Sequence, residues 1–124
     1  MKMFAAVIAL LALVSTPAVA LGNPGPEEFA QALIGNSLIG KTSKNRDYAV
    51  YYKADGTMDF QQSNGWTDHG TWRVEGGKFC QKWAVIRDGA AYCVRDFRRE
   101  NGSWSVFNEL LNERQEIDLR PGFV

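Results

Sequence analysis

Histidine and cysteine are scarce in this sequence, and the local motifs of the commonest catalytic sites are missing. The 124 residues include one histidine, two cysteines and four prolines. No G-x-S-x-G, H-E-x-x-H, P-loop or dinucleotide fingerprint occurs, which removes the usual sequence signals for many hydrolases, zinc peptidases and nucleotide-binding proteins. A basic block is also missing, and 14 Lys+Arg against 14 Asp+Glu give a formal net charge of +0. Because phosphate contacts need a concentrated basic face, this balance argues against a nucleic-acid partner.

Long apolar runs are missing too, apart from one at the N-terminus. Lys2 precedes the apolar run 4–14, and Ala18 and Ala20 supply small residues at positions −3 and −1 of a cleavage site. This pattern predicts a signal peptide over residues 1–20. The run is too short to span about 30 Å of hydrocarbon, so a retained membrane anchor is the disfavoured alternative. We expect a periplasmic or secreted protein with no stable membrane insertion after the signal is removed.

The remaining residues, 21–124, suffice for one domain with one core. Their two cysteines, Cys80 and Cys93, are expected to form a disulfide, because an even number of cysteines in an exported chain usually pairs in an oxidising compartment. The spacing does not fit a CxxC redox pair, and no partner ligands suggest a metal site. Closing this loop stabilises a domain by roughly 3 kcal/mol in the chain-entropy model.

A short helix is expected at the start of this domain. Pro26 suits the first helical position, Glu27 and Glu28 complement the positive end of the helix dipole, and Gly35-Asn36 is a helix stop. A helix of about two and a half turns is too short to be stable alone. It must therefore pack on the rest of the domain, either capping one end or lying across one face.

From Leu38 onward, apolar and polar residues alternate in short runs separated by turn residues. The alternating runs cover 48–53, 58–61, 70–75, 79–83, 92–97, 104–106 and, more weakly, 116–119. Seven to eight short strands with such frequent turns predict a mainly β protein, an antiparallel meander. A meander removes its exposed edges by closing, so a small barrel is favoured over a flat sheet.

The cysteines constrain one of these hairpins. A two-residue turn at Asp88-Gly89 would place Cys80 opposite Phe97 instead of Cys93. A disulfide therefore requires either a wider loop, with residues 85–88 at its tip, or a bulge that shifts the register by several residues. We favour the wider loop, because a covalent bond outweighs one turn preference.

Several short motifs follow one another along the chain. They are the N-terminal helix with Gly35-Asn36, the tyrosine-rich run 48–52, Asp55-Gly56-Thr57, Gly70-Thr71-Trp72-Arg73-Val74, and Cys80-x-x-Trp83 followed by Cys93. This order resembles a group of small exported proteobacterial proteins of unknown function, and the likeness carries no activity with it. A looser likeness to lipocalin-like barrels rests on Gly70-x-Trp72 and the meander. In lipocalins that element opens the first strand, whereas here it lies in mid-chain, so no ligand-pocket residues are carried over.

Five residues are candidates for a binding site. They are Trp66, His69, Gln81, Trp83 and Tyr92. Trp66 stands in a polar loop, where a large aromatic side chain suits contact with a partner or ligand. Gln81 alternates with Trp83, so its amide needs a partner or a ligand if that face points inward. The alternative interpretation of Trp72, Trp83 and Trp104 is a filled aromatic core.

The leading hypothesis is a non-enzymatic exported barrel that binds a small apolar or aromatic ligand or an envelope partner. The second is a protein inhibitor or envelope-stress module that acts through exposed loops with Trp66 as its anchor. The third is a hydrolytic enzyme with a carboxylate pair drawn from Asp47, Asp59 and Asp96. No spacing marks a nucleophile or metal partner for His69, so no catalytic residue, metal or cofactor is predicted.

Overall fold

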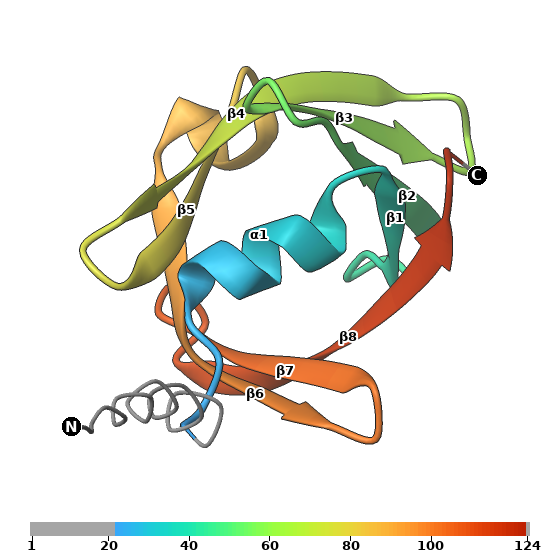
Figure 1. Ribbon diagram of the computed structural model, residues 1–124. Helices are drawn as coiled ribbons and strands as arrows, with labels where there is room; N and C mark the ends of the chain where they lie inside the picture. The colour runs from blue at the N-terminus through green and yellow to red at the C-terminus, as the bar shows by residue number, and fades with distance from the viewer. Residues whose placement is uncertain (1–21, 124) are drawn as a thin grey trace, which may run out of the picture.

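Eight antiparallel strands close into a barrel in which each strand pairs with the next along the chain (Figure 1). The computed structural model describes residues 22–123. The elements are α1 (Pro26–Leu33), β1 (Asn36–Lys41), β2 (Asp47–Tyr52), β3 (Thr57–Gln62), β4 (Thr67–Glu75), β5 (Lys78–Trp83), the short 3₁₀ turn η3 (Ile86–Gly89), β6 (Tyr92–Glu100), β7 (Ser103–Asn108) and β8 (Glu113–Pro121). The predicted mainly β barrel with one short helix is confirmed, whereas the signal peptide predicted over residues 1–20 lies outside the described residues.

Several strands are longer than their patterns indicate, among them β8 and β4. The prediction limited the last strand to 116–119, but β8 has nine residues because it pairs with both β7 and β1 and thereby closes the barrel. The ladder hydrogen bonds to β7 and β1 keep β8 extended even where its residues do not alternate clearly between apolar and polar. β4 begins at Thr67 instead of Gly70, since Asp68 pairs with Phe60 of β3.

The helix α1 closes one end of the barrel. Glu28 Oε1 accepts a hydrogen bond of 2.7 Å from the Gly25 backbone N–H, which satisfies a donor at the helix start. The apolar stripe of α1 faces the barrel interior, where the Phe29 ring lies 5.1 Å from Phe97 and 5.3 Å from Trp104. Figure 1 shows α1 crossing the ring of strands, so the capping alternative is the one observed. Within residues 22–123 there is no helix with the length and hydrophobicity that a membrane crossing needs.

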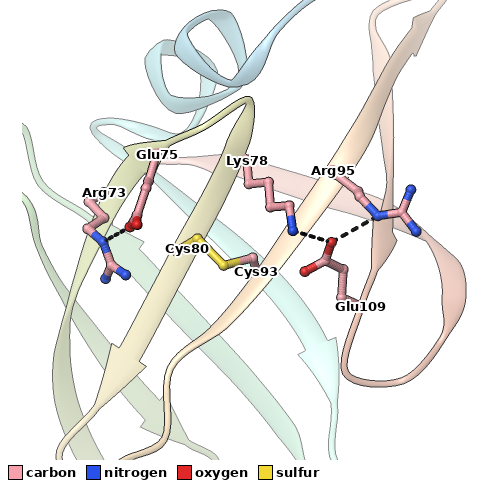
Figure 2. Close-up of a disulfide and its surroundings, with 7 residues drawn as sticks. All are labelled: Arg73, Glu75, Lys78, Cys80, Cys93, Arg95 and Glu109. Atoms are coloured by element: carbon pink, nitrogen blue, oxygen red, sulfur yellow. Dashed lines mark hydrogen bonds and ion pairs between the residues drawn. A yellow bond between two sulfur atoms is a disulfide. The ribbon is translucent and has the colours of Figure 1, made fainter.

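The disulfide joins neighbouring strands on the outer face of the barrel. Cys80 of β5 and Cys93 of β6 are directly opposed and bonded. The connection between the two strands contains η3, so the wider loop is confirmed and a two-residue turn is excluded. Figure 2 shows the bond between two groups of charged side chains, which are Arg73 with Glu75 on one side and Glu109 with Lys78 and Arg95 on the other.

A β-bulge in β6 overturns one expectation. Strict alternation places Phe97 on the outer face with Cys93, yet Phe97 is buried in the core. The register shifts between Arg95 and Arg98, and Asp96 adopts a left-handed φ of 55°. An extra residue in one strand reverses the face of every residue after it. Arg114 of β8 stabilises the bulge by donating hydrogen bonds to the Asp96 backbone carbonyl (2.8 Å) and carboxylate (2.6 Å).

Candidate functional site

A cavity of ≈ 620 Å³ lies inside the barrel. Phe29 of α1 forms its floor, and the mouth is at the opposite end, where the β1–β2 loop, η3 and Leu111 of the β7–β8 loop contribute to the lining. This volume falls within the range of about 300–1,000 Å³ typical of small-molecule sites. The barrel interior is therefore closed at one end by α1 and open at the other.

Seven aromatic side chains form a large part of the cavity wall. The aromatic lining residues are Phe29, Tyr48, Tyr52, Phe60, Phe79, Trp83 and Tyr92. Phe60 links two of them, because Tyr48 stacks on it at 5.1 Å and Trp83 meets it edge-to-face at 5.8 Å. Such mutual packing holds the rings in place, so the flat apolar wall is present before any ligand arrives.

Two glycines make room for these rings. A Cβ atom at Gly40 of β1 would lie 2.5 Å from the Tyr48 hydroxyl oxygen. A Cβ atom at Gly70 of β4 would collide with the backbone of β5 and lie 3.0 Å from the Trp83 ring. Small residues on β1 and β4 thus let large side chains of β2 and β5 fold against the sheet and leave the centre of the barrel open.

Two hydrogen bonds between polar side chains lie in the cavity lining. The buried Tyr52 hydroxyl donates a hydrogen bond of 2.7 Å to Gln81 Oε1. Burial raises the pKa of the Tyr52 phenol well above its usual range, so the hydroxyl keeps its proton. Trp83 Nε1 donates a hydrogen bond of 3.1 Å to the Tyr92 hydroxyl oxygen. The prediction that the Gln81 amide requires a partner is confirmed.

A second polar group lies at the mouth. Arg87 of η3 lines the cavity, and its guanidinium carbon stands 5.5 Å from the centre of the Tyr92 ring. Burial raises the pKa of the Tyr48 phenol, the neighbouring Tyr92 raises it further, and the positive charge of Arg87 lowers it. Arg87, Tyr48 and Tyr92 all line the cavity, and Arg87 lies over the Tyr92 ring.

Buried Asp68 anchors the loop that carries Arg87. Its Oδ2 atom accepts hydrogen bonds from the backbone N–H groups of Val85 (3.0 Å) and Ile86 (2.8 Å), and its Oδ1 atom accepts one of 2.8 Å from His69 N–H. Burial opposes ionisation of this carboxyl, but the three N–H donors outweigh it and hold the pKa of Asp68 below its usual value. A charge-assisted anchor thereby fixes η3 to β4.

The structure brings three of the five predicted site residues together. Gln81, Trp83 and Tyr92 line the cavity on neighbouring strands. Trp66 lies in the β3–β4 loop at the mouth end, 40% exposed, with its ring edge-to-face against Phe60 at 5.6 Å. His69 lies on the outer face of β4, exposed and outside the barrel cavity, where it lines a second pocket together with Trp83.

The carboxylates considered for hydrolysis are engaged elsewhere. Asp59 stands opposite His69 across the β3–β4 ladder but forms an ion pair of 2.8 Å with Lys53. Asp47 pairs with Lys41 and Asp96 with Arg114, both by contacts under 4.0 Å. Over residues 22–123, no group of three or more His, Cys, Asp or Glu side chains is placed to hold a metal ion.

Sequence reasoning did not select Tyr48, Tyr52 or Arg87 for the site. The alternation of Tyr48 and Tyr52 did place both on one face of a strand, but only the barrel register shows that this face meets Gln81. The residues around Arg87 indicate only a turn, so the sequence does not select Arg87 as a site residue. Two amides were also missed, Asn108 and Gln115, which line the cavity and bond to each other at 3.0 Å.

Large apolar side chains are exposed around the mouth. In a meander, alternate hairpin loops lie at the same end, so the loops 63–66, 84–91 and 109–112 share the mouth end with 42–46. Most of the exposed large apolar side chains of the described part of the chain lie on these loops; they are Trp66, Val85, Leu110 and Leu111, called here the apolar collar. Phe123 lies at the other end of the barrel and stacks on Tyr51.

The fold and the site define a closed eight-stranded antiparallel β-barrel with an aromatic cavity that opens at one end. No protein-family model, curated protein or solved structure matches this chain. The function that follows is therefore inferred from the chemistry of the cavity.

Proposed function

We propose that this protein is a non-enzymatic binding protein that holds a small apolar or aromatic ligand inside its barrel. The cavity of ≈ 620 Å³ with its aromatic wall is the observation that carries the proposal. Small-molecule sites are typically concave and mostly apolar, with a few polar groups that orient the ligand. The Tyr52–Gln81 and Trp83–Tyr92 hydrogen bonds supply such groups, and the amides of Asn108 and Gln115 add to them.

We further propose that the protein works in the periplasm or outside the cell. The Cys80–Cys93 disulfide supports this location, because structural disulfides persist in oxidising compartments. The signal-peptide pattern of residues 1–20 supports it independently. Expression of the full chain in a Gram-negative host, followed by fractionation and N-terminal sequencing, should yield a periplasmic form that begins at Leu21. A cytoplasmic form that retains Met1 would contradict this location.

Binding in the cavity can be tested by filling it. Val106 lines the cavity from β7, and Val106→Trp places an indole where the ligand would lie. Thr67→Trp adds the same ring to an exposed position of β4 and serves as the matched control. The probe is 2-naphthylethanol, a neutral aromatic alcohol, and binding is followed by isothermal titration calorimetry.

The wild-type chain and Thr67→Trp should bind this probe saturably with one site, and Val106→Trp should lose binding while remaining folded by circular dichroism. Overpacking costs typically about 1–3 kcal/mol, so the folded state of the filled variant is checked by its melting temperature. Equal binding by the filled variant, or no saturable binding by the wild-type chain, would reject the proposal.

The apolar collar favours a second candidate function, contact with an envelope partner at the mouth. Exposed aromatic and aliphatic side chains gathered at one end are typical of interaction surfaces. A photoreactive benzophenone amino acid at position 66 should crosslink one defined protein in intact cells, whereas the same group at position 123, also exposed but at the other end, should not. Identical crosslinks from both positions would exclude a mouth-specific contact.

A further inference from the structure

The cations that line the cavity mouth differ in how they are neutralised. Lys41 lines the cavity and forms an ion pair of 2.5 Å with Asp47. Arg87 also lines the cavity, but no carboxylate of residues 22–123 lies within 4.0 Å of its guanidinium. Its partner in the structure is the face of Tyr92, which leaves most of its N–H donors unused. The lining also includes the Glu116 carboxylate on β8, which does not lie within 4.0 Å of Arg87, so the Arg87 guanidinium has no carboxylate partner among the described residues.

The backbone that carries the Arg87 side chain is strained. Arg87 and Asp88 are consecutive residues in the left-handed region, with φ of 58° and 54°. Side chains other than glycine rarely adopt this region, and such strain persists only where the surroundings enforce it. The Asp68 carboxylate enforces it here through its hydrogen bonds to the preceding residues of the loop.

The neighbours of Arg87 are hydrogen-bond donors. The Tyr92 hydroxyl already accepts from Trp83 Nε1, so its proton is available to donate. The Tyr48 hydroxyl forms no hydrogen bond with any residue the structure describes, and its phenol responds to the charges of both Tyr92 and Arg87. One guanidinium and two phenols at the rim of a cavity lined in large part by aromatic rings form a site for a single negative charge.

We infer that the ligand is an acid-headed amphiphile, whose carboxylate binds Arg87 with Tyr48 and Tyr92 at the mouth while its apolar part lies against the aromatic wall. This inference rests on the proposed function and specifies its ligand class. A planar guanidinium matches a carboxylate through two parallel hydrogen bonds, and one cation balances one negative charge. The Ile86 and Leu111 side chains at the mouth suit the apolar segment next to the head group.

A pair of ligands that differ only in the head group tests this inference. Isothermal titration calorimetry at pH 7 compares 2-naphthylacetate with 2-naphthylethanol. The wild-type chain should bind the acid about 10- to 100-fold more tightly than the alcohol, since hydrogen bonds to charged groups contribute about 1.5–3 kcal/mol. Arg87→Gln should reduce affinity for the acid by that factor and leave affinity for the alcohol unchanged. Arg87→Lys should restore part of the acid affinity because it keeps the charge without the planar fork.

Lys44→Gln is the matched control. Lys44 lies on the β1–β2 loop at the same end of the barrel, is exposed and forms no ion pair with a described residue, but it does not line the cavity. Its substitution should change neither affinity. A loss equal to that of Arg87→Gln would mean general electrostatic attraction and would overturn the inference. Equal wild-type affinity for acid and alcohol would overturn it while leaving the proposed function standing, whereas no binding of either ligand would reject the proposed function itself.

Discussion

The Tyr52 hydroxyl donates a hydrogen bond to Gln81 Oε1 from a strand that is not a neighbour of the Gln81 strand in the sheet. β2 and β5 are separated by two further strands, so the bond crosses the barrel interior instead of following its wall. Both residues are buried, with 2% and 8% of their surface exposed. The bond therefore links β2 to β5 across the barrel interior and satisfies two buried polar groups.

Removing one partner of this bond should destabilise the protein. Tyr52→Phe leaves the buried Gln81 oxygen without its donor, and a group left unsatisfied in this way costs about 1–3 kcal/mol. The double variant Tyr52→Phe/Gln81→Leu replaces both partners with apolar groups and should recover part of that loss. Urea unfolding of the two single variants and the double variant measures this non-additivity. Strictly additive losses would show that the two side chains act independently.

The Asp68 anchor predicts a specific acid sensitivity. Because its folded-state pKa lies below the usual value near 3.8, the unfolded chain binds the proton more tightly, and the stabilising contribution is present above that value and lost as pH falls through the folded pKa. Asp68→Asn should lower the unfolding free energy at pH 7 by about 1–3 kcal/mol and flatten its pH dependence below about pH 5. Urea unfolding at several pH values measures both effects.

Asp118→Asn provides the control for this anchor. Asp118 is exposed on β8 and pairs only with Arg120, so its loss should change stability little. Hydrogen exchange gives an independent test, because the Val85 and Ile86 amides should exchange faster only in Asp68→Asn. Unchanged exchange at these amides would show that the loop is held by other contacts.

The disulfide should account for a large share of the stability margin. The bond closes a segment with a sequence separation of 13, and Cys80→Ser/Cys93→Ser should lose about 3 kcal/mol of unfolding free energy in the chain-entropy model. Thiol titration of the unfolded, unreduced chain should find no free thiol. Detection of both thiols under these conditions, or equal stability with and without reductant, would be incompatible with the structure.

Two tryptophans should respond differently to truncation. Trp66 is 40% exposed, so Trp66→Ala should cost less than about 1 kcal/mol despite its contact with Phe60. Trp104 is buried against Phe29, so Trp104→Ala should cost about 3–5 kcal/mol. Thermal unfolding compares the two variants. A loss of several kcal/mol at Trp66 would assign it to the core and remove the basis for the apolar collar.

The sequence predicts those features that depend on residues close together along the chain. Alternation alone places Gln81 and Trp83 on one face of β5, and the cysteine spacing alone requires either a wide β5–β6 loop or a bulge. The bulge at Asp96 was not predictable, because the side chain that stabilises it, Arg114, is 18 residues away on another strand. A bulge changes the face on which all later residues of the strand lie. Whether a bulge forms depends on long-range contacts, which local sequence patterns do not show.

The residues of the candidate site also divide into those that the local sequence predicts and those that depend on long-range contacts. Gln81 and Trp83 were predictable because an amide between aromatic residues on one strand face is unusual. Tyr52 was not, because its role depends on a partner across the barrel. Arg87 depends on three conditions at once: the loop width that the disulfide imposes, the left-handed backbone of η3, and the Asp68 anchor on β4. None of these conditions is visible in the residues next to it.

Nuclear Overhauser contacts between a bound probe and the protein test the central claim most directly. With 2-naphthylacetate bound to the isotope-labelled chain, the ring protons of the probe should contact the Val94 and Val106 methyl groups and the Trp83 indole, all of which line the cavity. His69 on the outer face should show none. Contacts confined to outer-face residues, or a probe that leaves the Val94 and Val106 resonances unchanged at saturation, would contradict the assignment of the barrel interior as the binding site.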